Sequence, residues 1–261
     1  MEKKFFRVII PTYGRRNYDE SMNSVLKQTC DDYQLYIVHD DANDGRYYIA
    51  DDVIHINCPT RRYNGGVRNY AMKTADQLNT LYVRPNEQYT LFLDDDDIFL
   101  DKDIIKDLKE LIEANDYPDL IRLPYGKLYV EENRTVVKML KNEIDISTIA
   151  ASSKVAPWTK CIKTDLFQLF PENTLHEDVV QHLKQCDVCQ TVVRFDRPVV
   201  QWRQYATQTS KAVEPKWDSD DWRFVADLME LTDLKHSYCQ NRRDEKIKQA
   251  KAEILKKYYH Q

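Results

Sequence analysis

The sequence contains no apolar run that approaches the roughly 20 residues needed to cross a membrane as a helix. We expect no secretory leader either, because the charged start Met1-Glu2-Lys3-Lys4 passes directly into a strand-like apolar run. Internal repeats and low-complexity segments are absent. The composition, with 42% hydrophobic and 31% charged residues, is that of an ordinary globular protein. These features predict a soluble protein of the cytoplasm.

Cysteine pairs that would indicate a disulfide framework or a zinc site are also lacking. Without an export signal, the default state of cysteine is the free thiol of a reducing cytosol. Cys186 and Cys189 form a single CxxC, whereas a zinc site needs a second pair or histidines at suitable spacing. We therefore interpret this pair as structural. The cysteines are Cys30, Cys58, Cys161, Cys186, Cys189 and Cys239.

Strong positive charge is absent too, since the formal net charge is −5. This disfavours extended coating of nucleic acid but remains compatible with a local basic face. The segment 242–258 is such a face, because apolar residues share one side of a predicted helix that is otherwise rich in Lys and Arg. We expect this helix to pack on the domain. The alternative is contact with an anionic membrane surface or with nucleic acid.

Four consecutive carboxylates, Asp94, Asp95, Asp96 and Asp97, follow a short apolar run that is typical of a buried strand. Adjacent carboxylates repel each other, and burying their charge is costly without compensation. A hard cation such as Mg²⁺ or Mn²⁺ compensates this charge and prefers carboxylate oxygen ligands. The segment therefore predicts a metal-diphosphate site. The alternative is a solvated turn before the next helix.

Strand-like and helix-like segments alternate over the first hundred residues, which predicts an α/β fold with a mostly parallel sheet flanked by helices. Polar loops follow the strands that end at Ile10, where Pro11 is expected to end the strand, at Val38 and at Leu93. These loops should meet at one edge of the sheet, where open α/β sheets bind ligands. The expected strands are 5–10, 34–38, 53–56 and 89–93, and the expected helices are 19–28, 64–78 and 102–115.

The helix that opens at Asn64-Gly65-Gly66 carries Arg68 one turn further on. Free amides at a glycine-rich helix start suit a phosphate, and a guanidinium can form a forked contact with it. The alternative is an ordinary Asn cap with two loop glycines. Both interpretations are equally compatible with this segment.

Beyond Pro118 the pattern changes to a strand at 120–123 and a hairpin over 127–140, followed by late strands at 192–195 and 198–202. From about residue 218 the chain is expected to be helical. Thr174 and Glu177 have the spacing of a capping box, which accounts for Glu177 structurally. Asp178 lies in the first turn of the same helix, where the dipole keeps a carboxylate ionised and available as a general base. The alternative is a surface Asp that only stabilises the helix.

Taken together, several short motifs of the sequence resemble those of glycosyltransferase family 2. They are Ile9-Ile10-Pro11-Thr12-Tyr13, Asp40-Asp41, Gly65-Gly66-Val67-Arg68-Asn69, Asp94 to Asp97, Glu177-Asp178, Trp158-Thr159-Lys160 and Trp202-Arg203 to Ser210. The resemblance covers about residues 5–211. The sequence departs from the family pattern at Ala42-Asn43, where Gly-Ser is usual, in a shorter Gly65 to Asn69 segment, and in the additional carboxylate of Asp95.

The resemblance implies a GT-A fold with a C-terminal helical extension, an inverting mechanism and a UDP-sugar donor held with Mn²⁺ or Mg²⁺. Thr12 and Tyr13 would line the base pocket, and Asp40 would accept the uracil N3–H, which adenine does not offer at that edge. Asp96 and Asp94 would serve the metal, Asp178 would be the base, and Arg203 would close over the diphosphate. The full nucleotide-sugar site would comprise Pro11, Thr12, Tyr13, Arg15, Asp40, Arg68, Asp94, Asp95 and Arg203.

These observations predict a hexosyltransferase that acts on a hydroxyl of a saccharide acceptor. The same chemistry could serve a lipid-linked sugar or a hydroxylated or already glycosylated DNA base, as in phage-type DNA modification. The motifs are also compatible with a nucleotidyltransferase or with a binding module whose site is inactive. We expect a nucleotide-sugar-binding half (1–100), an acceptor-binding and catalytic half (101–212) and a helical extension (213–261).

Overall fold

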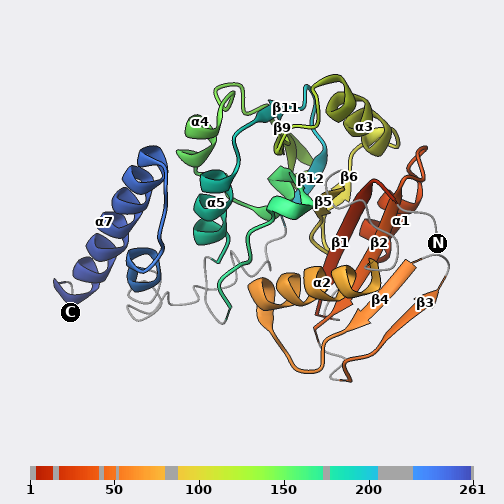
Figure 1. Cartoon of the computed structure of the whole chain (residues 1–261), viewed down its shortest axis with the longest axis horizontal. Coiled ribbons are helices and arrows are strands. Elements are labelled where there is room, and N and C mark those ends of the chain that lie inside the picture. Colours follow the sequence, from red (N-terminus) through yellow and green to blue (C-terminus); the bar gives the residue numbers. More distant parts are fainter. Residues whose placement is uncertain are drawn as a thin grey trace.

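The computed structural model describes residues 4–13, 18–40, 44–50, 53–79, 88–172, 177–204 and 226–259. Over these residues the chain forms a large sheet and a smaller one, with helices on both faces of the large sheet (Figure 1). The large sheet has the order β11-β7-β10-β5-β1-β2-β4-β3. Its strands are β1 (Phe6–Thr12), β2 (Tyr33–His39), β3 (Tyr47–Ala50), β4 (Val53–Asn57), β5 (Tyr89–Phe92), β7 (Leu120–Arg122), β10 (Lys160–Lys163) and β11 (Val192–Arg194).

The small sheet has the order β6-β12-β8-β9. Its strands are β6 (Ile98–Phe99), β8 (Tyr125–Tyr129), β9 (Arg134–Lys138) and β12 (Val200–Gln204). The principal helices are α1 (Asp19–Leu26), α2 (Tyr63–Asn79), α3 (Ile104–Ala114), α4 (Ile146–Ala150), α5 (Glu177–Val188) and α7 (Ser237–Tyr259). The predicted α/β class and the hairpin, now β8 and β9, are both confirmed.

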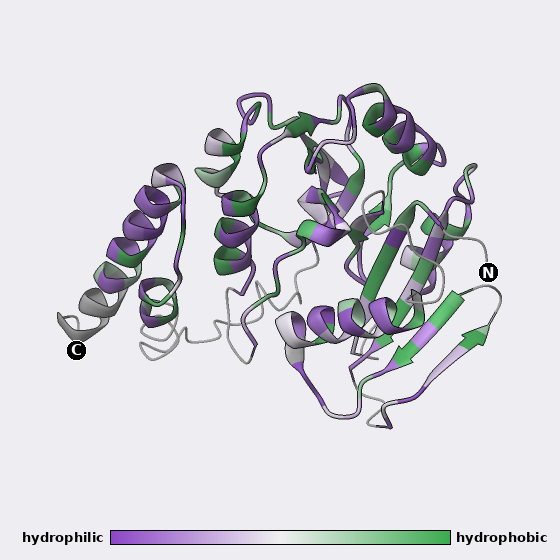
Figure 2. Cartoon of the chain, viewed as in Figure 1, coloured by the Kyte–Doolittle hydropathy of each residue, from purple (hydrophilic) through white to green (hydrophobic). Residues whose placement is uncertain are grey.

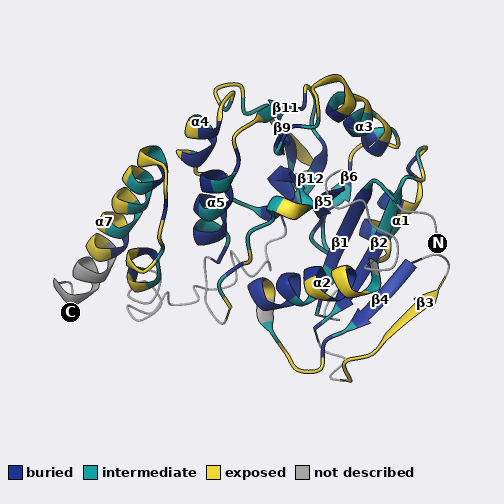
Figure 3. Ribbon diagram, viewed as in Figure 1, coloured by how far each residue is buried: buried dark blue, intermediate teal, exposed yellow. Residues whose placement is uncertain are grey.

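The central strand β1 pairs in parallel with β2 on one side and with β5 on the other. Its apolar run is continuous because both of its faces are buried. Successive side chains of a strand point to opposite faces. Accordingly Val8 and Ile10 pack with α1 and α3, whereas Ile9 packs with α2. Figure 2 shows the hydrophobic residues concentrated in these strands, and Figure 3 shows the same strands as buried.

The helix α3 has the predicted apolar stripe. Its residues Ile104, Ile105, Leu108 and Ile112 are buried and lie at the spacing of one helical face. The core of the protein is therefore formed on the α1 and α3 side by these residues and the strands beneath them.

Pro11 does not end the first strand, contrary to the expectation from sequence. β1 continues through Pro11 to Thr12, which pairs with His39. The carbonyl of Ile9 accepts from Leu93 N at 3.0 Å, so Ile9 faces β5, and Pro11, two residues on, faces the same side. Pairing with β5 stops at Ile9 and Phe92. The missing N–H of Pro11 therefore removes no bond from the sheet.

The sequence pattern missed several elements, among them β3, β6, α4 and β10. β3 is the edge strand beyond β4, and all four of its residues are exposed, so it has no burial pattern to recognise. α4 is a five-residue helix held by a capping box in which Asp145 Oδ1 accepts from Thr148 N. The large sheet also combines strands from both sides of residue 100, because β10 lies beside β5.

The C-terminal helix α7 packs antiparallel to α5. Cys239, near its start, lies in a cluster with Cys186, and Ile247 packs against Val180 nearer the start of α5. This confirms a packed helix over the part of α7 whose side chains are described. Among the described residues, no helix combines the length and the apolar character needed to cross a bilayer.

Candidate active site

The four consecutive carboxylates form a tight turn at the carboxyl end of β5. Asp97 N donates to Asp94 O at 3.0 Å, and β6 begins at the next residue. The four side chains are not equivalent. Asp97 is completely buried, whereas Asp94, Asp95 and Asp96 are partly exposed. The turn therefore leaves three carboxylates partly accessible and directs one fully into the protein.

Asp97 anchors this turn to the rest of the fold. Its Oδ1 accepts from Arg203 N at 2.8 Å, and its carbonyl accepts from Ser21 Oγ at 2.5 Å. Burial, together with the negative charge of Asp94, raises the pKa of Asp97 well above its usual value. Among the described residues its Oδ2 is buried without a hydrogen-bond partner. Asp97 is therefore a structural residue of the turn.

Arg203 braces the same turn from β12. Its Nε donates to the carbonyl of Asp96, and its Nη1 donates to the Glu20 carboxylate on α1. The sequence pattern ends the last predicted strand at residue 202, but Arg203 lies within β12 and is buried. Residues 205–210 of the predicted Trp202 to Ser210 motif lie outside the described residues.

Arg68 joins three elements through one buried guanidinium. Its Nη2 donates to Asp94 Oδ1 at 2.8 Å, and its Nη1 donates to Glu177 Oε1 at 3.2 Å. Burial alone would lower the pKa of Arg68, but the charges of Asp94 and Glu177 raise it, so the group stays charged. α2, the acidic turn and the start of α5 are therefore tied together at a residue that is only 5% exposed.

The first turn of α5 supplies Glu177 and Asp178. Glu177 is buried, and this burial raises its pKa to about 7 against the opposing effect of Arg68. Asp178 is half-buried, and its charge contributes to raising the pKa of both Glu177 and Arg68. The capping box expected between Thr174 and Glu177 falls on residues that the structure does not describe. In the described part Glu177 faces Arg68.

Gly65 permits this close approach of α2 and α5. A Cβ on Gly65 would lie 2.3 Å from Pro171 O and 3.1 Å from Glu177 Cγ, so only glycine fits. Asn69, one turn on, fixes the same contact. Its Nδ2 donates to Phe170 O, and its Oδ1 accepts from Phe170 N, both at 2.9 Å. The close packing therefore explains why position 65 is a glycine, whether or not a phosphate also binds there.

A second group of predicted residues meets at the ends of β1 and β2. Asp40 N donates to Thr12 O at 2.9 Å, and Asp40 Oδ1 accepts from Arg62 N at 2.6 Å. The guanidinium of Arg61 lies 4.0 Å from the centre of the Tyr13 ring. Asp40 and Thr12 are buried, and Tyr13 is half-buried. Arg15 and Asp41 lie outside the described residues.

Sequence reasoning missed Arg61 and Arg62, which precede α2 in a segment without a recognisable motif. It also missed Glu172, whose Oε1 accepts from Asn69 Nδ2 at 3.0 Å. These residues reach the site only through the folding of their segments. Their charge did not distinguish these three residues as site residues, because 31% of the chain is charged.

The acidic turn is compatible with a divalent metal. Over the residues that the structure describes, no group of three or more His, Cys, Asp or Glu side chains is assembled for an ion. Mg²⁺, however, is commonly held by one or two carboxylates, with substrate phosphates and water as the other ligands. Asp94 and Asp96 are partly exposed oxygen ligands on one turn, so they fit this arrangement.

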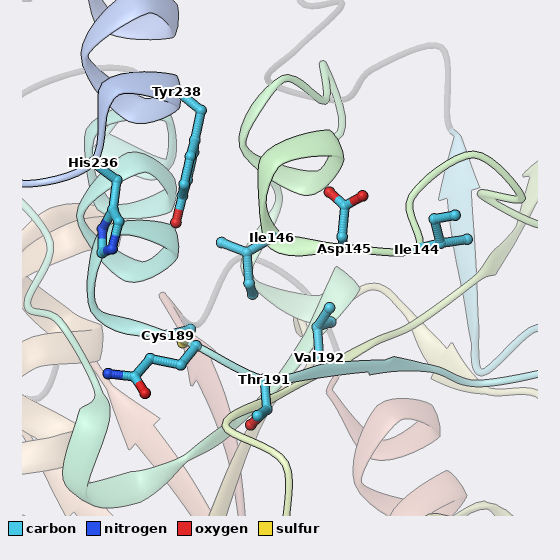
Figure 4. Close-up of a pocket in the computed structure, with 9 residues that line it drawn as sticks. Ile144, Asp145, Ile146, Cys189, Thr191, Val192, His236 and Tyr238 are labelled. Carbon is cyan, nitrogen blue, oxygen red and sulfur yellow. The ribbon is translucent and has the colours of Figure 1, made fainter.

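A pocket of ≈ 590 Å³ lies elsewhere on the molecule, and Asp145, Cys189, His236 and Tyr238 contribute to its lining (Figure 4). It is found where α5 ends, whereas Asp178 lies where α5 begins. With 12 residues in α5, the two places are about 17 Å apart along the helix. The pocket is therefore separate from the acidic turn.

Comparison with known proteins shows which family and which solved structures the chain resembles. A family model described as "Glycosyl transferase family 2" matches residues 7–148, which is more than half of the chain. The chain is also similar to the crystal structure of S. aureus TarS 1–349 in complex with UDP-GlcNAc, with a TM-score of 0.66 and 20% identity over 98% of this chain and 72% of that one.

Two further structures of the same protein are similar. The complex of TarS 1–349 with UDP gives a TM-score of 0.61 and 20% identity, over 100% of this chain and 72% of that one. The longer S. aureus TarS gives 0.64 and 20%, over 95% of this chain and 43% of that one. This likeness shows a shared GT-A fold. With the matched family model, it establishes that the chain is a glycosyltransferase and belongs to glycosyltransferase family 2.

Proposed function

We propose that this glycosyltransferase moves a hexose from a UDP-sugar to a hydroxyl of a saccharide acceptor, with inversion and with the help of Mn²⁺ or Mg²⁺. The observation that carries the proposal is the buried guanidinium of Arg68. It contacts Asp94 in the acidic turn and Glu177, the neighbour of Asp178. The proposed donor side and the proposed base therefore belong to one connected site.

The proposed base pocket consists of Thr12, Tyr13 and Asp40 at the carboxyl ends of β1 and β2. A carboxylate accepts an imide N–H, which uracil has and adenine lacks at that edge. The ring of Tyr13, with Arg61 against one side, offers a flat surface to a base. The TarS structures were determined with UDP-GlcNAc and with UDP, which supports a uridine nucleotide as the donor.

Asp96 and Asp94 would hold the metal. When bound, such an ion neutralises the charge that develops on the leaving diphosphate. Arg68 contributes fixed positive charge behind Asp94, since its guanidinium is buried and remains charged. Arg203 and Asp97 keep the turn in place by contacts to its backbone and to β12.

Asp178 is the proposed general base. It would take the proton of the acceptor hydroxyl as the oxygen attacks the anomeric carbon and the bond to the diphosphate breaks. A single displacement of this kind inverts the configuration, as it does in inverting glycosidases. Asp178 is half-buried at the helix start, so it combines access to an acceptor with a charge favoured by the helix dipole.

The test is UDP release from a panel of UDP-sugars with Mn²⁺, with and without EDTA. We expect slow hydrolysis of one donor, its loss on chelation, and its recovery on adding back Mn²⁺. If no UDP-sugar is turned over and none binds in a metal-dependent manner, the proposed donor is wrong. Release of pyrophosphate instead of UDP would indicate nucleotidyl transfer.

A further inference from the structure

One face of the small sheet carries alternating aromatic and cationic side chains. The strand register places Trp202 of β12 beside Lys127 of β8, and places Tyr129 of β8 beside Arg134 of β9. Lys127 and Tyr129 are two residues apart, so they project from the same face of the sheet. We call these four residues, Trp202, Lys127, Tyr129 and Arg134, the cation–aromatic ladder.

The distances show that the ladder is continuous. Lys127 Nζ lies 4.7 Å from the centre of the Trp202 ring and 4.8 Å from that of the Tyr129 ring. Arg134 Cζ lies 4.3 Å from the Tyr129 ring. Both rings are therefore within the range in which a cation is attracted to an aromatic face. Hydrogen bonding to Lys127 also lowers the pKa of the Tyr129 hydroxyl.

Buried rings support one end of this ladder. Trp158 lies 5.7 Å from Trp202 and 5.0 Å from Tyr125, measured between ring centres, and both Trp158 and Tyr125 are buried. Trp202, Lys127 and Tyr129 remain half-buried, and Arg134 is exposed. The ladder is thus a partly exposed surface on a rigid base.

The ladder also lies close to the acidic turn. β6 follows that turn directly, and the small sheet continues from β6 through β12 to β8. Neighbouring strands are about 4.8 Å apart, so Lys127 lies about 10 Å from the strand that leaves the turn. An acceptor whose hydroxyl is presented at the site could extend onto this face.

We propose that the cation–aromatic ladder binds the acceptor saccharide and that this acceptor carries carboxylate or phosphate groups. The inference rests on the proposed function and specifies its acceptor. The rings of Trp202 and Tyr129 offer apolar area to the C–H faces of sugars. Lys127 and Arg134 supply charge-assisted hydrogen bonds to anionic substituents.

A nucleic-acid strand is the competing ligand, since single strands also combine stacking with phosphate contacts. Two features favour the saccharide. The formal net charge is −5, and Glu132 pairs with Arg134 at 2.9 Å at the end of the ladder, which shortens the run of positive charge. A short anionic oligosaccharide matches this limited surface better than a long polyanion.

The test is calorimetric titration of the full chain with four probes. They are a neutral glucan tetrasaccharide, tetragalacturonate, a tetrasaccharide carrying phosphate monoesters, and a single-stranded deoxyoligonucleotide. We expect at least one anionic saccharide to bind about tenfold more tightly than the neutral one, and added salt to weaken that binding. The carboxylate and phosphate probes distinguish the two sources of charge.

Lys127→Gln and Tyr129→Leu should each weaken binding of the anionic saccharide by about tenfold. Lys106→Gln is the matched control, because Lys106 is an exposed lysine on α3 that pairs with Glu110. Equal binding of the neutral probe, tighter binding of the oligonucleotide, no saturable binding of either anionic saccharide, or unchanged binding by both ladder variants would each overturn the inference. UDP release by the wild-type chain without acceptor tests the proposed function separately.

Discussion

The buried Arg68 Nη2 lies 2.8 Å from Oδ1 of the partly exposed Asp94, and this ion pair connects α2 with the acidic turn. The opposite edge of the guanidinium contacts Glu177, so removing the charge would leave two carboxylates without their counter-ion. Asp94 and Glu177 are far apart in the sequence, and both contact this residue. The connection makes the site sensitive to changes at Arg68.

Arg68→Met should lower the free energy of unfolding by about 3 kcal/mol, because breaking a buried ion pair leaves an uncompensated charge. Urea unfolding followed by circular dichroism measures this change. Arg7→Met is a comparison, since Arg7 pairs at 2.5 Å with Asp76, whose side chain is 60% exposed and can be solvated. A smaller loss for Arg68→Met than for Arg7→Met would contradict the proposed bridging role.

Asp96→Ala should lower activity, whereas Asp97→Asn should leave it nearly unchanged. Asp96→Ala keeps the backbone carbonyl that accepts from Arg203 but removes a proposed metal ligand, so UDP release should fall by about 100-fold or more with stability retained. Asp97→Asn keeps an oxygen for Arg203 N and resembles the neutral form of the buried acid, so both activity and stability should stay near wild type.

Asp97→Ala completes this comparison. It removes the acceptor for Arg203 N in a buried place, which should cost about 1–3 kcal/mol of unfolding free energy. Thermal unfolding and UDP release, measured on all three variants, separate the metal-ligating role from the anchoring role. If Asp97→Asn were as inactive as Asp96→Ala, Asp97 would have to act in the chemistry.

Asp178→Asn should reduce sugar transfer by about 10²–10⁴-fold and leave UDP-sugar affinity unchanged, because the amide keeps the shape but cannot take a proton. Transfer rates and equilibrium binding of the donor are the two measurements. Glu110→Gln, on the exposed side of α3, is the control for loss of a carboxylate. Near wild-type transfer by Asp178→Asn would exclude it as the base.

Glu177 predicts a pH dependence of stability. Burial raises its pKa from 4.5 to about 7, so between these values the folded chain binds a proton that the unfolded chain has released. The free energy of unfolding from this group is therefore highest below pH 4.5 and falls as the pH rises towards 7, by at most about 3 kcal/mol. Glu177→Gln should flatten the curve over this window.

Urea titrations of the wild type and of Glu177→Gln at several pH values provide the test. The difference between the two proteins isolates this group from other carboxylates. A difference that grows in the opposite direction would mean that Arg68 stabilises the ionised form more than burial destabilises it.

Gly65→Ala should be strongly destabilising, because the added Cβ would lie 2.3 Å from the carbonyl oxygen of Pro171. Overpacking of this kind costs about 1–3 kcal/mol. Gly126→Ala is the matched control, since its Cβ would meet its nearest atom, Thr135 Cγ2, at an ordinary 3.4 Å. Thermal melting of the two variants distinguishes them, and equal melting temperatures would contradict the close packing of α2 on Phe170, Pro171 and Glu177.

Local patterns in the chain were sufficient for the fold class and for proposing much of the candidate site. The apolar runs of β1, β2 and β5 predicted parallel strands, because strands buried on both faces are continuously hydrophobic. Asp40 and the four Asp residues follow these strands directly, so their meeting at one sheet edge follows from the chain order. The apolar stripe on α3 could also be predicted from the sequence, since its residues recur with the period of a helix.

The different roles of the residues within the site depended on tertiary contacts. Four adjacent Asp residues look alike in the sequence, yet Asp97 is buried as an anchor while its neighbours stay partly exposed, because β12 brings Arg203 N to Asp97. In the same way Glu177 looked like a capping residue until α2 placed Arg68 against it. The cation–aromatic ladder joins β12, β8 and β9, and nothing local in those strands signals it.

The physical reason is the range of the interactions involved. Hydrophobic periodicity and turn chemistry are properties of neighbouring residues, so the chain order alone determines them. Burial, pKa shifts and ion pairing arise from groups more than a hundred residues apart, as with Arg68 and Glu177 or Asp97 and Arg203. Those properties exist only once the two sheets and α5 have packed together.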